Sequence, residues 1–216
     1  MFQAAVYSLT RVNAAYVSAA LSYGWYSMST DRAVTLAGGE DLTAAFDAND
    51  VGGRIEGGYR FAIPGVFSLP GFGITPYSAL QAQYFITPSY QETAASGAST
   101  FALAYNSQKA IMIQTELGAW FDQTIALGNG ASLALWTRAA WAHDSWSGTS
   151  MTATFESLPG SSFTVIGALP AADSLLASVG AGISFKNGIS LAGEFYSQLG
   201  QSWQTYGGFA RLRYSW

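Results

Sequence analysis

The residues with the most familiar catalytic chemistry stand side by side in the segment His143-Asp144-Ser145. A histidine base, a carboxylate and a serine hydroxyl together form the triad of many hydrolases. The segment ends an alternating run that is typical of a β-strand, and adjacent strand residues point to opposite faces. Three consecutive residues therefore cannot converge on one substrate, and His143 is interpreted as an interfacial side chain. We expect no catalytic residue and no enzymatic activity.

Cofactor, metal and nucleic-acid sites are not expected either. The sequence contains one histidine and no cysteine, so a thiolate metal site and a disulfide are excluded. The glycine pairs at 52–53 and 57–58 lie inside a strand pattern with no helix after them, unlike a phosphate-binding loop. They are interpreted as places of close backbone approach. The net charge of −4 argues against a nucleic-acid partner.

The composition indicates that much of the surface does not meet water. Of the 216 residues, 50% are hydrophobic and only 10% are charged, whereas a soluble domain usually carries about 25% charged residues. A membrane helix needs roughly 20 consecutive apolar residues, and the sequence has no such run. The other structure that satisfies its backbone inside lipid is a closed β-barrel.

Apolar and polar residues alternate with period two along most of the chain. In 132–144, for example, Leu135 and Trp141 fall on one face and Arg138 on the other. The charged residues that this alternation turns inward, either to line a hydrated pore or to pair across strands, are Arg54, Glu56, Arg60, Glu116, Arg138, Glu194, Arg211 and Arg213. The aromatic residues interpreted as outward interfacial girdles are Trp25, Tyr84, Phe121, Trp141, Tyr214 and Trp216.

The same alternation predicts about nine long strands, near 2–9, 14–28, 50–62, 73–86, 108–122, 131–145, 174–186, 189–199 and 203–216. Short connections are expected near 10–13, 63–72, 123–130 and 187–188, and longer ones near 29–49, 87–107 and 146–173, with a short exception near 200–202. The long connections hold the acids Asp31, Glu40, Asp41, Asp47, Glu92, Glu156 and Asp173. Short periplasmic turns and long extracellular loops are the outer-membrane pattern. The β-like runs within 150–168 are expected either as an extracellular hairpin or as barrel wall.

The last strand is the most specific feature of the sequence. Its outward residues are Tyr206, Ala210, Leu212, Tyr214 and Trp216, and the chain ends on an aromatic side chain. The strand resembles the signal by which the outer-membrane barrel assembly machinery recognises its clients, although that signal commonly has glycine where Arg211 stands.

Over nearly its whole length the chain resembles the C-terminal translocator, or β-domain, of type V autotransporters. The resemblance is carried by GGRIEGGYRF at 52–61, TELGAWFD at 115–122, RAAWAHD at 138–144 and the closing ISLAGEFYSQLG…YGGFARLRYSW. It implies a twelve-stranded barrel whose lumen holds a helical segment leading to a secreted passenger polypeptide. It also implies export and display of that passenger without a cofactor.

We therefore expect an all-β fold, an antiparallel transmembrane β-barrel of the outer-membrane type, with about nine of twelve strands in one domain over residues 1–216. The start, Met1-Phe2-Gln3-Ala4, shows no signal peptide, and strand parity fits strands four to twelve, so N-terminal truncation is expected. The expected function is an outer-membrane translocator pore or anchor. Its expected partners are outer-membrane lipid, the assembly machinery and a passenger polypeptide. A small porin-like or structural barrel is the alternative, and an outer-membrane enzyme is a third hypothesis.

Overall fold

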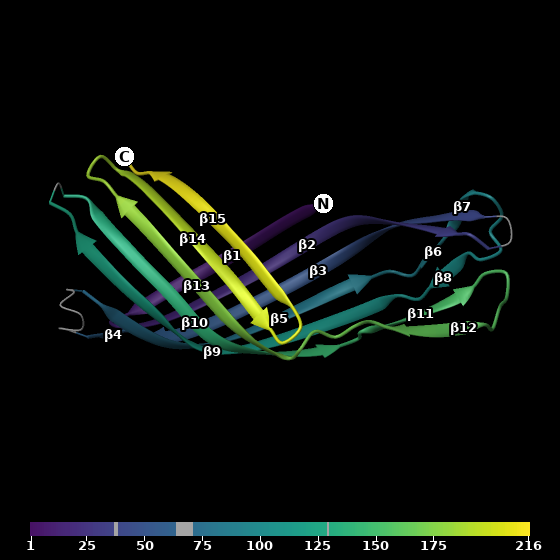
Figure 1. The fold of residues 1–216 in the computed structure, drawn as a ribbon, viewed down its shortest axis with the longest axis horizontal. Coiled ribbons are helices and arrows are strands. Elements are labelled where there is room, and N and C mark those ends of the chain that lie inside the picture. Colours follow the sequence, from purple (N-terminus) through teal and green to yellow (C-terminus); the bar gives the residue numbers. More distant parts are fainter. Residues whose placement is uncertain (37–38, 64–70, 129) are drawn as a thin grey trace.

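The computed structural model describes residues 1–36, 39–63, 71–128 and 130–216, and every regular element in these residues is a β-strand. The main antiparallel sheet follows the order β1-β2-β3-β5-β9-β10-β13-β14-β15 (Figure 1). The bounds of these strands are β1 Phe2–Val12, β2 Ala15–Val34, β3 Glu40–Tyr59, β5 Gly73–Thr87, β9 Gln108–Ala126, β10 Ser132–Ser147, β13 Asp173–Ser184, β14 Ile189–Gly200 and β15 Gln204–Tyr214. The expected all-β antiparallel fold is confirmed.

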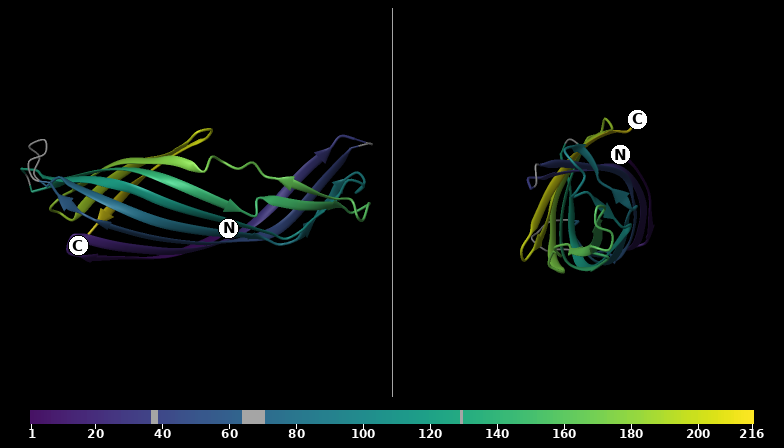
Figure 2. Two further views of the ribbon diagram at one scale, coloured as in Figure 1. Left: turned by 90° about the horizontal axis from the view of Figure 1, so that it is seen from below. Right: turned by 90° about the vertical axis from the view of Figure 1, so that its right-hand side faces the viewer.

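The main sheet curls into a half-barrel, as the view along its long axis shows (Figure 2). Neighbouring strands on this path pair antiparallel, so successive connections alternate between the two ends of the sheet. We call the end with the connections 13–14, 127–131 and 185–188 the turn end, and the opposite end the loop end. Within the described residues, the chain contains no helix with the length and apolar character needed to cross a membrane.

The turn between β1 and β2 consists of Asn13 and Ala14, because Val12 still pairs with Ala15. Asn13 has a φ of 56°, a left-handed conformation that asparagine tolerates better than most residues. The predicted turn near 10–13 is therefore shorter in the structure, and Arg11 belongs to β1. The predicted turn near 63–72 lies largely outside the described residues.

The predicted long connection at 29–49 is wrong. β2 and β3 each continue for 20 residues, and they pair without interruption from Ala15↔Tyr59 to Val34↔Glu40. The outward face of this segment carries Asp31, Asp41 and Asp47 in place of large aliphatic residues, so it lacks the pattern of a lipid-facing strand, yet the pairing of β2 with β3 continues through it. The acids expected in that loop lie in the strands instead; they are Asp31, Glu40, Asp41 and Asp47.

The other two long connections also contain strands. Residues 87–107 hold β6 (Tyr90–Gln91), β7 (Thr93–Ser96) and β8 (Leu103–Tyr105), and β7 pairs with β3. Residues 146–173 hold β11 (Ser150–Phe155) and β12 (Ser162–Ile166), which form a hairpin. This hairpin pairs with β8 in a second sheet of order β12-β11-β8-β6, so the hairpin interpretation is confirmed and the barrel-wall interpretation is wrong. We call residues 26–36, 39–48, 90–105 and 150–166 the crown.

One face of the main sheet is apolar and the other is polar. Residues paired across the strands share a face, and the outward face exposes large aliphatic side chains that are each about half accessible: Val17, Leu21, Ile55, Leu80, Leu117, Val179 and Leu191. In the described part of the main sheet, outward acidic, basic and histidine residues occur only toward the loop end: Asp31, Asp41, Asp47, Lys109, His143 and Asp173. The outward aromatics include all the predicted girdle residues within the strands: Trp25, Tyr84, Phe121, Trp141 and Tyr214.

Large side chains on the concave face lie across small residues of the neighbouring strand. Trp136 pairs with Gly180, and a Cβ atom on Gly180 would lie 2.2 Å from the indole ring. The same indole Nε1 donates a hydrogen bond to Glu194 at 2.8 Å, so the ring cannot turn away without losing a partner. Glycine at this position is therefore required by close approach rather than by backbone conformation.

We predict that Gly180→Ala destabilises the sheet by about 1–3 kcal/mol, the usual cost of overpacking. The matched substitution Gly193→Ala, on the outward face, should be nearly neutral because the nearest atom to its Cβ is 3.6 Å away. Urea unfolding in detergent, followed by tryptophan fluorescence, measures both. Equal midpoints for the two variants would show that the indole does not need this space.

Candidate functional site

A charged network occupies the middle of the concave face. Glu56 of β3 and Glu116 of β9 both pair in register with Ala79 of β5, so the two carboxylates stand on either side of a small residue. Arg54 contacts both of them: its Nη2 lies 2.7 Å from Oε2 of Glu56, two residues along the same strand, and 2.9 Å from Oε2 of Glu116, across β5. One guanidinium thereby neutralises part of two carboxylates that come from different strands.

Two tyrosines complete the hydrogen bonding of these carboxylates. Tyr16 donates its hydroxyl to Glu56 Oε1 at 2.6 Å, and Tyr77 donates to Glu116 Oε2 at 3.1 Å. Glu116 is only 3% exposed, and a carboxylate that is buried to this degree needs such partners to remain charged. The network therefore links β2, β3, β5 and β9 through side chains in addition to the backbone ladder.

Arg138 joins the network from β10. Its Nη1 lies 3.8 Å from Glu116 Oε2, and its guanidinium lies over the Trp120 ring, 5.3 Å from the ring centroid. An arginine at this distance over an indole is stabilised by a cation–π interaction. Two arginines thus face two glutamates at mid-height, and the centre of the concave face is close to neutral.

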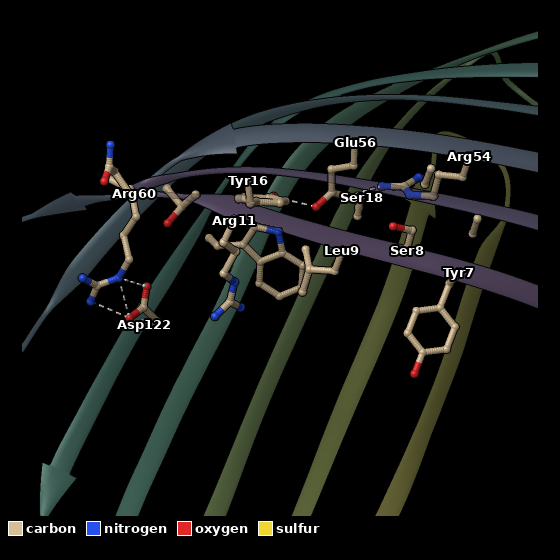
Figure 3. Close-up of a pocket in the computed structure, with 16 residues that line it drawn as sticks. Tyr7, Ser8, Leu9, Arg11, Tyr16, Ser18, Arg54, Glu56, Arg60 and Asp122 are labelled. Carbon is tan, nitrogen blue, oxygen red and sulfur yellow. Dashed lines mark hydrogen bonds and ion pairs between the residues drawn. The ribbon is translucent and has the colours of Figure 1, made fainter.

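A second ion pair lies nearer the turn end. Arg60, which follows β3 directly, places Nε and Nη2 at 3.0 and 2.7 Å from the two carboxylate oxygens of Asp122 (Figure 3). The Arg60 Nη2 also donates to the carbonyl of Gly71 at 3.0 Å. This arginine therefore fastens the end of β3 to β9 across β5.

The structure places all eight predicted pore-lining residues on the concave face. Arg54, Glu56, Glu116, Arg138 and Arg60 belong to the two groups just described, and Glu194 accepts the Trp136 hydrogen bond. Arg211 and Arg213 share that face because Phe209, two residues earlier, pairs with Glu194. The concave face is hollowed by cavities of about 730 and 590 Å³, and Arg54 lines both.

Sequence reasoning did not identify several concave residues that complete these groups: Arg11, Tyr16, Tyr77, Trp120, Asp122 and Trp136. The signal was present, because each of these residues stands at the polar phase of the alternation. Among the aromatic residues, however, only those on the outward face were singled out, and Arg11 was assigned to the turn near 10–13. Aromatic side chains on the polar phase of a barrel strand are thus candidates for hydrogen bonding to inward carboxylates.

Residues 1–195 match the family described as the autotransporter β-domain. The chain belongs to this family. Autotransporter β-domains are translocator barrels of the bacterial outer membrane rather than catalytic domains. A comparison with curated proteins finds no match. The family match ends within β14, so the residues of the last strand that are expected to form an assembly signal lie outside it.

The autotransporter β-domain shows no convergence of His143, Asp144 and Ser145. His143 Nδ1 lies 3.0 Å from Asp173 Oδ1 on the outward face, whereas Asp144 is buried on the other face and accepts a hydrogen bond from Gln114 at 2.8 Å. Within the described residues, no group of three acidic, histidine or cysteine side chains is placed to hold a metal ion.

Within the crown, residues 90–105 are held to the end of β2 by a buried carboxylate, Glu92, which is 3% exposed. Arg32 Nε donates to Glu92 Oε1 at 3.0 Å, the Leu103 N–H donates to Oε2 at 3.0 Å, and the Tyr105 hydroxyl donates at 3.3 Å. Burial alone works to raise the pKa of Glu92, but these hydrogen bonds outweigh it and hold the pKa below its usual value of 4.5. The charged form is therefore the one that stabilises the crown.

We predict that Glu116→Gln destabilises the sheet by about 3–5 kcal/mol, because it leaves Arg54 and Arg138 without their shared carboxylate. The matched change Glu156→Gln removes an exposed crown carboxylate and should cost no more than about 0.5 kcal/mol. Urea unfolding in detergent reports both values. Similar losses in the two variants would mean that the network contributes little to stability.

We also predict that the crown loosens in acid. Because the folded-state pKa of Glu92 is lowered, its contribution is fully present above pH 4.5 and is lost as the pH falls through the lower folded-state value. Hydrogen exchange at the Leu103 amide, corrected for the intrinsic rate, should show protection falling over this range. Glu92→Gln should give weak protection at neutral pH with little further change in acid. Wild-type protection that is independent of pH would contradict this assignment.

Proposed function

We propose that this chain is an outer-membrane translocator pore and anchor that exports or displays a passenger polypeptide. The observation that supports this proposal is the unequal distribution of charged residues between the two faces of the main sheet. In the described residues, the outward face of the main sheet carries acidic, basic and histidine side chains only toward the loop end, whereas the concave face carries the charged network. Arginine at a lipid-facing midplane costs about 2–4 kcal/mol, so lipid on the convex side and water on the concave side account for this division.

The proposed mechanism is passive. The inward charges at mid-height neutralise one another, and tyrosine hydroxyls hydrogen-bond to the carboxylates, so the wall presents polar groups without a strong net charge to retain a passing chain. An extended polypeptide then has a water-filled path along the lumen, past Arg54, Glu116 and Arg138. No bond is made or broken in this function, and folding of the passenger outside the cell supplies direction.

We propose further that residues 1–216 form one barrel domain whose loop end faces the cell exterior, with the barrel assembly machinery acting on β15. This strand is an edge of the main sheet. Its outward residues are strongly exposed in the structure, at 56% for Tyr206, 74% for Leu212, 60% for Tyr214 and 101% for Trp216. Together with Ala210 they form an apolar row that a binding partner in the membrane can read.

We predict that a short, uncharged, epitope-tagged passenger fused before Met1 behind an export signal reaches the cell surface. Antibody binding and protease access on intact cells measure this exposure. The matched control fuses the same passenger to a soluble periplasmic protein, for which no surface exposure is expected. Both fusions should become fully accessible after the cells are opened.

The porin-like alternative gives a different result. A porin-like barrel would reach the outer membrane and raise the uptake of small solutes, while the tagged passenger stayed in the periplasm. That outcome, with correct insertion shown by altered gel mobility of the unheated protein, would contradict the translocator proposal.

A further inference from the structure

A row of outward side chains crosses three neighbouring strands near the loop end. Trp141 of β10 pairs in register with Leu175 of β13, and Leu175 pairs with Leu199 of β14. Paired residues share a face, so all three stand on the outward face, where Trp141 is 47% and Leu175 is 49% exposed. Each of these strands has a neighbour on both sides, so the row lies away from the edges of the sheet.

Asp173 holds the indole ring of Trp141 in place. Trp141 Nε1 donates a hydrogen bond to Asp173 Oδ1 at 3.0 Å, and His143 Nδ1 lies 3.0 Å from the same oxygen. The His143 ring also lies near the indole, with the ring centroids 5.8 Å apart. These contacts use one oxygen of the carboxylate, and Asp173 Oδ2 has no hydrogen-bond partner among the described residues. The indole is therefore oriented before any ligand binds.

A shallow hollow of about 360 Å³ lies beside these residues. Its lining includes Trp141, Leu175 and Leu199 together with two polar residues toward the loop end, Asp173 and Gln201. Small-molecule sites are mostly lined by aromatic and aliphatic side chains, with a few polar groups that fix the orientation of the ligand. The hollow has this composition, and its volume lies within the range of such sites, roughly 300–1,000 Å³.

We propose that this hollow binds a glycolipid of the surrounding membrane. The sugar headgroup lies against Trp141, Asp173 and Gln201, and the hydrocarbon chain lies against Leu175 and Leu199. A charged carboxylate accepts hydrogen bonds and donates none, so Asp173 favours a headgroup that supplies donors, as the hydroxyl groups of a sugar do. A phosphate headgroup offers acceptors and a like charge instead.

The position of the hollow along the wall favours a lipid as the source of the sugar. On the outward face of β13, Val179 and Leu175 are followed toward the loop end by Asp173, and on β10 His143 follows Trp141 in the same way. The hollow thus lies where the aliphatic surface ends, which is the level at which a lipid changes from hydrocarbon to headgroup. Tryptophan suits this boundary because its ring is apolar and its N–H is polar. Since Asp173 already binds the N–H, the exposed face of the ring remains for the C–H groups of a sugar.

The test uses the full chain in dodecylphosphocholine micelles, with isotope-labelled indole nitrogen atoms, and two probes that share an octyl chain. One probe is octyl glucoside, and the other is octylphosphocholine, whose headgroup contains no hydrogen-bond donor. Octyl glucoside should shift the indole NMR signal of Trp141 saturably, whereas octylphosphocholine should not. Trp141→Phe identifies the signal. Trp25, another outward tryptophan, is the internal control and should follow only the general change in micelle composition.

Three variants test the polar contacts. Asp173→Ala should weaken octyl glucoside binding about five- to ten-fold, the effect of losing one hydrogen bond. Gln201→Ala leaves the contact between Trp141 and Asp173 intact and should weaken binding about two- to five-fold. Asp47→Ala is the matched control, because it removes an exposed outward carboxylate of β3 and should leave the affinity unchanged. Unchanged signals of the other tryptophans show that each variant is folded.

Equal saturable shifts with the two probes, equal shifts of Trp25 and Trp141, or equal losses of affinity in the Asp47 and Asp173 variants would overturn the inference. An equally large response to a lysolipid with an ethanolamine headgroup would identify an ammonium group as the ligand and would overturn it as well. The hollow lies outside the lumen, so the site is independent of export. Surface exposure of the tagged passenger without octyl glucoside binding refutes this site alone, and binding without exposure refutes export alone.

Discussion

The cost of placing charge against lipid is the constraint on which the rest of this structure depends. A barrel wall has only two faces, so a charged residue that cannot face acyl chains has to face the lumen, where it needs a partner within a few ångströms. Arg54, Glu56 and Glu116 meet both demands at once. The resulting wall is apolar on its outer face, and the inward charges at mid-height, which come from different strands, neutralise one another.

This pairing also fixes the register of the sheet. Ala79 stands between Glu56 and Glu116 and leaves room for Arg54 to contact both, and Gly180 stands between Trp136 and Glu194. Large inward side chains thus require small inward residues on the strand that they cross. A slip by one residue would turn each glutamate toward lipid and each aliphatic residue toward water. Backbone pairing alone would permit that slip, and the side chains forbid it.

The sequence allowed the nine long strands, their facing and the family to be predicted, because lipid on one side and water on the other impose a strict period of two. It did not allow the extension of β2 and β3 through residues 29–49 to be predicted, because the outward positions there do not carry the aliphatic residues that contact with lipid requires. Specific partners were also out of reach. The Tyr77–Glu116 and Arg60–Asp122 contacts join strands that are far apart in sequence, and strand order, spacing and side-chain reach together decide which residues meet.

The position of a strand in the sheet decides whether its inward charge is satisfied. Arg54 on β3 and Arg60, just after β3, both bind a carboxylate on β9, and β5 lies between the two strands. Such a contact requires two further strands on the same side of β3. Strands β3, β5, β9 and β10 each have a neighbour on both sides, so an inward arginine on one of them can find a carboxylate one or two strands away, as Arg138 and Arg54 do. Strand order, as much as the spacing of residues along the chain, therefore decides which inward charges are neutralised.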